Sequence, residues 1–435
     1  MNRNLNRNKE SSMSGLKKKL EKTPVWNVVR AILRIPPVKA VWKKIKKLRS
    51  NAVRFYTLKV CYPRLYGKYA KEPVDPRKVI FMEVRLDRIT NSFRLLYDQL
   101  TQEKEYDVHV HFLRNSFVSA REYHQNCKAF IRDLATAKYV FVNEASNVLG
   151  CVKKRPETIV TQTWHGCGAF KKFGFSTAEL IFGLNRKEML KYPFYTNYNY
   201  VTLSSPEVAW AYEEAMNLHD HPEVLKAVGS SRTDVFFDQK FIGNAYETIH
   251  RVMPQSKGKK IILYAPTFRG RVANGKAPDR MDIPMLKKAL GEEYVLVIKQ
   301  HPLVRKAPEV PEDCRDFAMD VTKTMEIEDL ICVSDICISD YSSLVFEYSL
   351  FERPMIFFAY DREEYDDWRG FYYNYDEMTP GPICVSNEEI IDYIQNLDTR
   401  FDKQQIIDFK YKFMRSCDGH ATERILEMTG IHQKG

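Results

Sequence analysis

The sequence lacks several patterns that would define its class at once. Its 435 residues contain no apolar run of about 18 residues, so we expect no membrane span. The nine cysteines include no Cys-x-x-Cys pair, which argues against a zinc finger and against a disulfide framework. The 18 glycines and 20 prolines recur without a period, which excludes a collagen-like chain. With 44% hydrophobic and 28% charged residues, the composition is that of a folded protein.

Acidic residues are scarce at the start of the chain. Residues 1–54 hold 16 Lys or Arg and two Asp or Glu, whereas the remainder is slightly acidic. Apolar residues recur there at helical spacing, and most lysines fall off that stripe: Val38, Val41, Trp42, Ile45, Leu48 and Ala52. A shorter apolar segment, Val25–Ile35 with Trp26, precedes Pro36-Pro37. We expect a basic amphipathic helical arm on an anionic membrane surface, where each Lys or Arg contributes about 1 kcal/mol.

The arm has two alternative roles that stay open. Trp26 and Trp42 could pack on the protein's own body while the lysines face water, or the arm could bind nucleic acid. The slightly acidic remainder and the lack of any known nucleic-acid module disfavour the second role, so we expect no nucleic-acid partner. Met1–Lys19 is polar and basic without a signal-peptide core, so we expect the chain to stay inside the cell.

Beyond residue 77, short apolar runs alternate with helical patterns. Predicted strands are Val79–Glu83, Tyr106–Leu113, Tyr139–Val142, Thr158–Thr163, Tyr200–Leu203, Lys226–Val228, Ile261–Tyr264, Tyr294–Ile298, Asp316–Met319, Ile336–Ser339 and Pro354–Phe358. Predicted helices include Ser92–Gln102, Ala120–Ala135, Pro206–Met216, Ile283–Leu290, Glu326–Val333, Ser342–Phe351 and Asn387–Asn396. The pattern predicts an α/β protein with two doubly wound Rossmann-type domains facing one cleft. We divide the chain into an arm (1–54), a connector (55–77) and domains 78–252 and 253–435.

Ligands of such sheets bind beyond the carboxyl ends of the strands, which directs attention to the strand-to-helix loops. The first loop contains His165, Gly166, Lys171 and Lys172. Imidazole can accept a proton at neutral pH, glycine lets a ligand approach the backbone, and lysine suits phosphate. The pattern is not the dinucleotide fingerprint, because Lys171 stands where its third glycine would be. A purely structural histidine is the alternative.

Four further segments carry polar residues, three of them at predicted strand ends. Lys299 and His301 follow one strand and could meet an anionic substrate, or only hold their loop by hydrogen bonds. Asp340, Ser342 and Ser343 precede a predicted helix, where they could form an anion site or act only as caps. The others are Thr267 and Arg269 after the strand Ile261–Tyr264, and Asp376 and Glu377 in the aromatic loop Arg369–Pro382.

In this order, the segments resemble the CDP-glycerol glycerophosphotransferase family, which builds teichoic acid primers and polymers. Trp164-His165-Gly166 and Lys171-Lys172 match the family pattern, whereas Cys167 and Gly168 replace its Thr-Pro. The segment Gly229–Phe236, with Arg232 and Asp234, and the segment Asp418–Arg424 also match, with Ser231 in place of Pro and His420 in place of Lys. The resemblance spans about Val79 to Ile425.

The resemblance implies a GT-B-like body, peripheral attachment at the cytoplasmic face of the plasma membrane, a CDP-glycerol donor and a lipid-linked saccharide acceptor. It places the acceptor in the first domain and the CDP-alditol in the second. The expected reaction is attack of an acceptor hydroxyl on the β-phosphorus with release of CMP, for which positioning and charge stabilisation matter most. We expect no cofactor, and no carboxylate cluster has the spacing of metal ligands.

The resemblance maps two essential histidines onto His165 and His301, with His165 as general base. The proposed donor and phosphate contacts are Lys299, Arg269, Thr267, Ser342, Ser343, Asp340 and Gly166. The substrate-contact candidates are Lys171, Lys172, Arg232, Asp376 and Glu377. Alternatives are a CDP-ribitol-dependent transferase, a capsule-type nucleotide-sugar glycosyltransferase of GT-B fold, and a non-catalytic scaffold at the membrane surface.

Overall fold

The computed structural model describes residues 36–178, 180, 183, 185–270, 275–304, 306–363, 365 and 370–431. It divides into two units, Met1–Arg64 and Leu65–Gly435. The first unit contains the helix α3 (Pro36–Tyr56) and a π-helical turn (Thr57–Cys61), and α4 (Tyr62–Tyr69) follows. The predicted arm helix is therefore confirmed, and its two prolines stand in the first turn, where a missing N–H costs nothing. The segment Val25–Ile35 with Trp26 lies outside the described residues.

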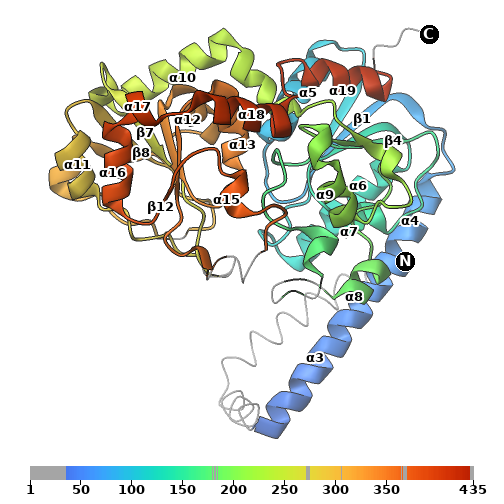
Figure 1. The fold of residues 1–435 in the computed structure, drawn as a ribbon. Coiled ribbons are helices and arrows are strands. Elements are labelled where there is room, and N and C mark those ends of the chain that lie inside the picture. Colours follow the sequence, from blue (N-terminus) through green and yellow to red (C-terminus); the bar gives the residue numbers. More distant parts are fainter. Residues whose placement is uncertain are drawn as a thin grey trace. The chain divides into compact units, whose positions relative to one another are not determined.

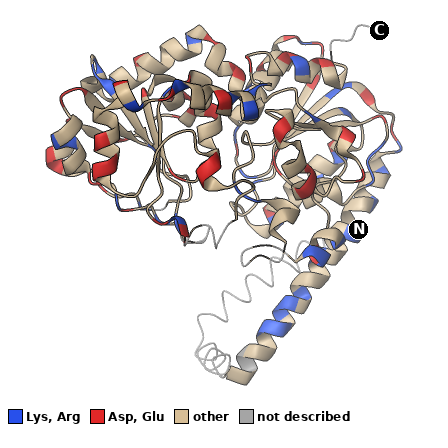
Figure 2. Ribbon diagram, viewed as in Figure 1, with Lys and Arg blue, Asp and Glu red and all other residues tan. Residues whose placement is uncertain are grey.

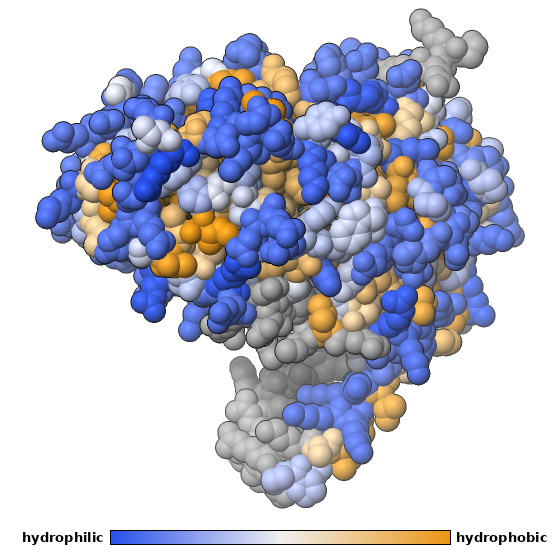
Figure 3. Space-filling model, viewed as in Figure 1, coloured by the Kyte–Doolittle hydropathy of each residue, from blue (hydrophilic) through white to orange (hydrophobic). Residues whose placement is uncertain are grey.

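Helix α3 is amphipathic along its length. Val41, Trp42, Ile45 and Leu48 are exposed apolar side chains, and lysines fill the positions between them. Figure 2 shows Lys and Arg along α3, and Figure 3 shows hydrophobic beside hydrophilic surface on the same helix. Across the described part of the chain, none of the helices is both long enough and apolar enough to cross a bilayer.

The first sheet has six parallel strands in the order β2-β1-β3-β4-β5-β6. Its strands are β1 (Asp75–Glu83), β2 (Asp107–Phe112), β3 (Ala137–Val142), β4 (Ile159–Gln162), β5 (Tyr200–Thr202) and β6 (Leu225–Lys226). The helices of this part are α5 (Asn91–Gln102), α6 (Ala120–Leu134), α7 (Asn147–Gly150), α8 (Arg186–Lys191) and α9 (Ala209–Met216). The strand order reverses between β1 and β3, and ligands of doubly wound sheets bind at such a point.

The second sheet is also parallel, in the order β12-β11-β10-β7-β8-β9. Its strands are β7 (Lys260–Tyr264), β8 (Tyr294–Ile298), β9 (Ala318–Asp320), β10 (Ile336–Ser339), β11 (Met355–Phe358) and β12 (Ile383–Cys384). The later helices are α10 (Gln239–Val252), α11 (Ile283–Leu290), α12 (Ile327–Val333), α13 (Leu344–Tyr348), α15 (Tyr375–Met378), α16 (Asn387–Gln395), α17 (Leu397–Arg400), α18 (Lys403–Met414) and α19 (Ala421–Thr429). This is the Rossmann order, with its reversal between β7 and β10.

The two sheets form two lobes, and the chain passes between them more than once (Figure 1). Helix α10 packs against α12 beside the second sheet, whereas α19, near the end of the chain, packs against α5 of the first. Ile425 and Leu426 of α19 are fully buried in one core with Val79 and Phe81 of β1. The expected α/β fold with two doubly wound domains is confirmed. The exact boundaries at residues 54, 77 and 252 stay predictions.

Most predicted strands agree with the structure to within two residues. The two-residue strand β12 was not predicted, because it is defined by its pairing with β11 and not by a strand pattern of its own. The helix predicted over Ser342–Phe351 is instead the five-residue α13 followed by a 3-10 turn, Ser349–Phe351.

Candidate active site

The loop after β4 presents His165. Trp164 adopts a positive φ of 56°, a strained conformation for a bulky residue, and its N–H donates to Gln162 Oε1 at 3.0 Å. The Trp164 ring lies 4.4 Å from the imidazole of His165, centroid to centroid. Backbone and ring together fix the direction of the histidine as the chain leaves the strand.

The hydrogen bond of His165 assigns its ring nitrogens. Nδ1 lies 3.2 Å from the backbone carbonyl oxygen of Asn143, which can only accept, so Nδ1 carries the proton and Nε2 keeps a lone pair. Removal of water by the surrounding protein lowers the pKa of His165, and the nearby carboxylate of Glu144 partly opposes this shift. The side chain is still 47% exposed, so a ligand can reach it.

Glu144 was not among the predicted site residues. Its Oε1 lies 3.8 Å from His165 Nδ1, and its Oε2 forms an ion pair with Arg85 at 3.0 Å. Asn143 and Glu144 follow β3, the strand next to β4, so parallel pairing brings them to the histidine. In the sequence, the one indication of a site role for these two residues was their position at the carboxyl end of a predicted strand.

The histidine loop contacts the second lobe through two glycines. A Cβ added to Gly166 would lie 3.5 Å from Ser343 Oγ, so the two predicted loops meet. Gly168 has φ of +65° and lies so close to Phe346 of α13 that a Cβ would come within 2.4 Å of its ring. The positive φ and the clash of a Cβ with Phe346 both favour glycine at this position, and the proline of the family pattern could not adopt this φ. Contact with the Cys417 thiol, together with burial, raises the pKa of Cys167, so its thiol stays protonated and is no nucleophile.

The side chain of Arg232 is 13% exposed and ties the two lobes together. Its guanidinium donates to the carbonyl oxygen of His165 at 2.5 Å and to Glu328 Oε1 of α12 at 2.6 Å. Its Nε also forms an ion pair with Glu347 Oε1 of α13 at 3.3 Å. The structure therefore places Arg232 behind the histidine loop, where it contacts the backbone of that loop and two carboxylates.

Lys171 and Lys172 pair with the backbone of Gly370 and Phe371, which belong to the aromatic loop of the second lobe. Lys171 forms an isolated β-bridge with Phe371, and Lys172 N–H donates to the carbonyl of Gly370 at 3.0 Å. The ammonium group of Lys171 lies 5.3 Å from the centre of the Tyr365 ring. This pairing joins the histidine loop to the aromatic loop of the second lobe.

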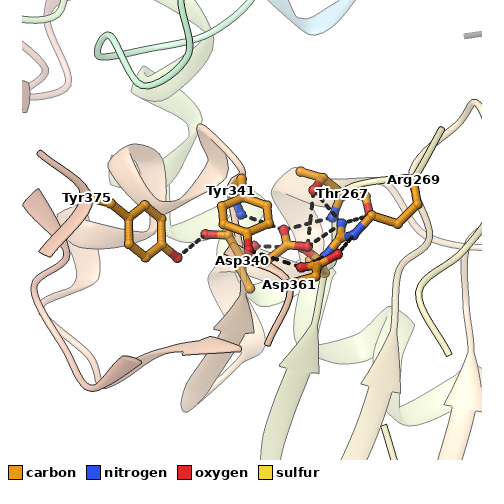
Figure 4. Close-up of polar contacts among 8 residues, drawn as sticks. Thr267, Arg269, Asp340, Tyr341, Asp361 and Tyr375 are labelled. Atoms are coloured by element: carbon orange, nitrogen blue, oxygen red, sulfur yellow. Dashed lines mark hydrogen bonds and ion pairs between the residues drawn. The ribbon is translucent and has the colours of Figure 1, made fainter. Parts of the chain in front are cut away.

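A second group of predicted residues meets at the reversal point of the second sheet (Figure 4). Both oxygens of Asp340 accept from Thr267, through its N–H at 2.9 Å and its hydroxyl at 3.1 Å. Arg269 donates to Asp340 Oδ2 at 2.8 Å and to both oxygens of Asp361 at 2.5 and 2.9 Å. Tyr341 O–H also donates to Asp361 Oδ1 at 3.0 Å. Because two carboxylates surround one guanidinium, Arg269 organises the loops here and offers no excess positive charge.

The remaining residues that were predicted to contact phosphate differ in their hydrogen-bond partners. Ser342 Oγ accepts from Leu344 N–H at 3.3 Å, as a cap does, whereas the Ser343 side chain is exposed. Lys299 donates to the backbone carbonyls of Thr322, at 2.9 Å, and of Met325. Its ammonium group therefore holds the loop after β9.

His301 shows the opposite ring assignment to His165. Its Nδ1 accepts from the N–H of Leu303 at 3.1 Å, so the ring proton of the neutral imidazole is on Nε2. The ring lies 4.8 Å from that of Phe268 and is partly buried. The Leu303 contact thus fixes Nδ1 of His301 as an acceptor.

A cavity of about 630 Å³ opens at the carboxyl ends of β7, β8 and β11. Tyr264, Ile298, Gln300 and Phe358 are among its lining residues. Gln300 is buried, and its side-chain Oε1 has no hydrogen-bond partner among the described residues. Because Gln300 also lines the cavity, it is a candidate for a ligand contact, and sequence reasoning had passed over this residue.

The other predicted residues have partners of their own. Asp376 pairs with both terminal nitrogens of Arg362, at 2.5 and 2.6 Å, and Glu377 is exposed on α15. Arg369 lies outside the described residues. Asp234 accepts from the N–H groups of Ala421 and Thr422, at 3.1 and 2.7 Å, so the segments Gly229–Phe236 and Asp418–Arg424 meet and dock α19.

Comparison with known proteins identifies a family whose model matches most of the chain. Residues 65–429 match the family model described as CDP-Glycerol:Poly(glycerophosphate) glycerophosphotransferase. The chain is 33% identical over 360 residues to the teichoic acid ribitol-phosphate primase of Bacillus spizizenii, which covers 82% of this chain and 91% of that relative. It is 31% identical over 296 residues to the teichoic acid glycerol-phosphate primase of Bacillus subtilis, covering 67% and 72%. A solved structure of the wall teichoic acid polymerase TagF aligns with TM-score 0.69 and 22% identity over 90% of this chain and 98% of that chain, which agrees with a GT-B-like fold.

Proposed function

The chain belongs to the CDP-glycerol:poly(glycerophosphate) glycerophosphotransferase family, and from this premise we propose that it transfers an alditol phosphate from a CDP-alditol to a hydroxyl of a lipid-linked saccharide. Family membership makes it a transferase of teichoic acid synthesis with a CDP-linked alcohol as donor. The observation that carries the proposed chemistry is the Nε2 lone pair of His165, at the carboxyl edge of the first sheet.

In the proposed step, Nε2 of His165 takes the proton of the acceptor hydroxyl as its oxygen attacks the β-phosphorus. The new bond joins that oxygen to the β-phosphorus, and the bond from the β-phosphorus to the bridging oxygen breaks, so CMP leaves with the electron pair. Glu144 stabilises the imidazolium that forms, because its carboxylate lies 3.8 Å from Nδ1. Such transfer depends on positioning and electrostatics rather than on a covalent enzyme intermediate.

The second lobe supports donor binding. We propose that Gln300, which lines the cavity, and the following residue, His301, contact the donor, because both follow β8 at the carboxyl edge of the second sheet. Ser343 is the exposed hydroxyl that faces the histidine loop. We therefore assign donor contacts to Gln300, His301 and Ser343, and assign Arg269, Thr267, Asp340, Lys299 and Arg232 to positioning these loops.

Two donors remain in competition. The sequence resemblance predicts CDP-glycerol, whereas the relative at 33% identity, matched over 91% of its length, is a ribitol-phosphate primase. We place CDP-ribitol first for that reason and keep CDP-glycerol as the second candidate, supported by the glycerol-phosphate primase at 31%. Attachment of the arm to the cytoplasmic face of the plasma membrane, close to a lipid-linked acceptor, is part of the same proposal and rests on the exposed apolar and basic residues of α3.

CMP release tests this function. The purified chain is given CDP-ribitol, CDP-glycerol or a UDP-sugar, each with and without a lipid-linked saccharide acceptor. We expect acceptor-dependent CMP release from a CDP-alditol, faster with CDP-ribitol. Acceptor-dependent turnover of the UDP-sugar alone would instead identify a glycosyltransferase, and the absence of turnover with every donor would favour a scaffold.

A further inference from the structure

A cluster of two histidines and an aspartate lies on the first sheet, apart from the residues assigned above. His109 and His111 stand two residues apart on the edge strand β2, so their side chains share one face. Asp133, in the last turn of α6, places Oδ2 2.9 Å from His109 Nδ1 and 2.8 Å from His111 Nε2. Within the described ranges, this is the one group of three such side chains whose ligand atoms lie within 4.8 Å of one another.

Both ring nitrogens of His109 face carboxylates, which is more than one neutral imidazole can donate to. Its Nδ1 faces Asp133, and its Nε2 lies 2.8 Å from Asp107 Oδ2. A neutral imidazole has one N–H, so it can donate to only one of two carboxylates. Either the ring is an imidazolium, or a cation occupies the Nδ1 side and Nε2–H donates to Asp107.

We propose that His109 Nδ1, His111 Nε2 and Asp133 Oδ2 bind a divalent transition-metal ion of the zinc class. Imidazole nitrogen and carboxylate oxygen are suitable donors for such an ion. Ligand atoms about 2.0–2.1 Å from a tetrahedral zinc lie roughly 3.3 Å from one another, so the two spacings to Asp133 Oδ2 need to open by a few tenths of an ångström. The two ring nitrogens lie within 4.8 Å of each other. Water would fill the fourth position.

The surroundings of the three ligands fit such a site. Asp107 would accept from Nε2–H of His109 and hold the ring with Nδ1 toward the metal, as carboxylates commonly do behind a zinc-bound histidine. Lys78 lies on the other oxygen of Asp133, 3.7 Å from Oδ1, and leaves Oδ2 to the metal. The His109 and Asp133 side chains are about 30% exposed, so an ion can enter from solvent. The bound metal would join β2 to α6, and its ligands were hidden from sequence reasoning because Asp133 follows His111 by 22 residues.

The competing state of this cluster is a metal-free set of ion pairs. Partial burial lowers the pKa of His109, but hydrogen bonds to Asp107 and Asp133 outweigh this effect and leave that pKa above its usual value.

Zinc titration distinguishes the metal site from the metal-free cluster. Untagged full-length protein, freed of metal by a chelator, is titrated with ZnCl₂ by calorimetry and with Co²⁺ by visible absorption. We expect one Zn²⁺ per chain, a rise in the midpoint of thermal unfolding with Zn²⁺, and the visible bands of a tetrahedral Co²⁺ site. His111→Gln and Asp133→Asn should abolish uptake, and Asp107→Asn should weaken it by about 10–100-fold.

The control is His219→Gln, which removes an exposed histidine that also pairs with a carboxylate, Glu213, at 2.8 Å. It should leave zinc uptake unchanged. The wild-type titration decides alone if the ligand variants fail to fold: absence of stoichiometric uptake would overturn the proposal and leave the metal-free cluster. Uptake that persists in folded His111→Gln or Asp133→Asn would overturn it as well.

Discussion

At the scale of residues, two histidines present opposite ring nitrogens. His165 donates from Nδ1 to the carbonyl of Asn143, whereas Nδ1 of His301 accepts from the N–H of Leu303. In the neutral rings, Nε2 of His165 therefore holds a lone pair, whereas Nε2 of His301 carries the proton. This division matches a reaction in which one group receives the hydroxyl proton and another stabilises phosphate charge.

Loss of the proposed base should slow the chemistry without unfolding the protein. His165→Ala should lower kcat by about 10²–10⁴-fold, with little change in the thermal midpoint because the side chain is 47% exposed. Turnover with a CDP-alditol and thermal unfolding measure the two effects, and His219→Gln is the control. Near-normal turnover of His165→Ala would remove it from catalysis.

The pH profile should report the same imidazole. Activity requires neutral His165, so kcat/KM should rise with pH through its pKa, and the surrounding protein holds that pKa below the usual value of about 6.5. The Glu144 carboxylate raises the pKa, so Glu144→Gln should move the acid limb to still lower pH while reducing the rate. An acid limb that does not move in Glu144→Gln would argue that another group titrates.

The two serines after β10 should behave differently. Ser343→Ala should weaken CDP-alditol binding, measured by calorimetry without acceptor, because its exposed hydroxyl faces the histidine loop. Ser342→Ala should mainly cost stability, by about 0.5–2 kcal/mol, because its hydroxyl accepts from Leu344 N–H. If both variants bind donor normally, neither serine belongs to the site.

Sequence reasoning found the loops of the site but not the partners of their residues. His165 could be predicted, because a histidine between a strand and glycines is a local pattern. The role of Arg232 could not, since its carboxylate partners are 96 and 115 residues away in the chain. Gln300 was visible at a strand end, but its buried, unpartnered oxygen is a property of the folded chain.

At the scale of elements, the histidine loop lies between β4 and α13. Gly168 allows the loop to touch Phe346, and Arg232 holds its backbone to Glu328 and Glu347. The three contacts of this guanidinium therefore hold the histidine loop against α12 and α13.

Removing this guanidinium should therefore affect folding as well as catalysis. Arg232→Met should destabilise the protein by about 3–5 kcal/mol, because it leaves two buried carboxylates without their cation. Denaturant unfolding measures the loss, and the exposed Arg400→Met is the matched control. Unchanged stability combined with lost substrate affinity would instead support the predicted substrate contact.

Helix α3 should act as a membrane-binding element. A chain that starts at Arg54 should bind anionic vesicles weakly, lose most activity on a lipid-embedded acceptor and keep activity on a short soluble acceptor. Vesicle binding by the full chain should weaken as salt rises, because its electrostatic part is screened. Vesicle sedimentation with and without the arm measures this difference. Unfolding of the shortened chain would show that the arm is a packed structural element.

At the scale of the whole molecule, the two sheets could be predicted and the connections between the lobes could not. Apolar strands such as Tyr294–Ile298 are visible in the sequence, because strands buried on both faces are continuously hydrophobic. The docking of Ile425 and Leu426 on β1 has no local signal, since it joins residues at opposite ends of the body. The same holds for the Thr267, Arg269 and Asp340 network, whose members meet only when β7 and β10 pair.

The identity of the group gained by the acceptor tests the proposed function most directly. A soluble saccharide acceptor is incubated with the full chain and an equimolar mixture of CDP-ribitol, CDP-glycerol and a UDP-sugar, and the product is analysed by mass spectrometry. We predict a gain of one phosphoalditol unit with one CMP released per transfer, and the loss of this product in His165→Ala. A gain of a sugar residue without phosphate, or a phosphoalditol product that persists in His165→Ala, would contradict the proposed reaction or its base.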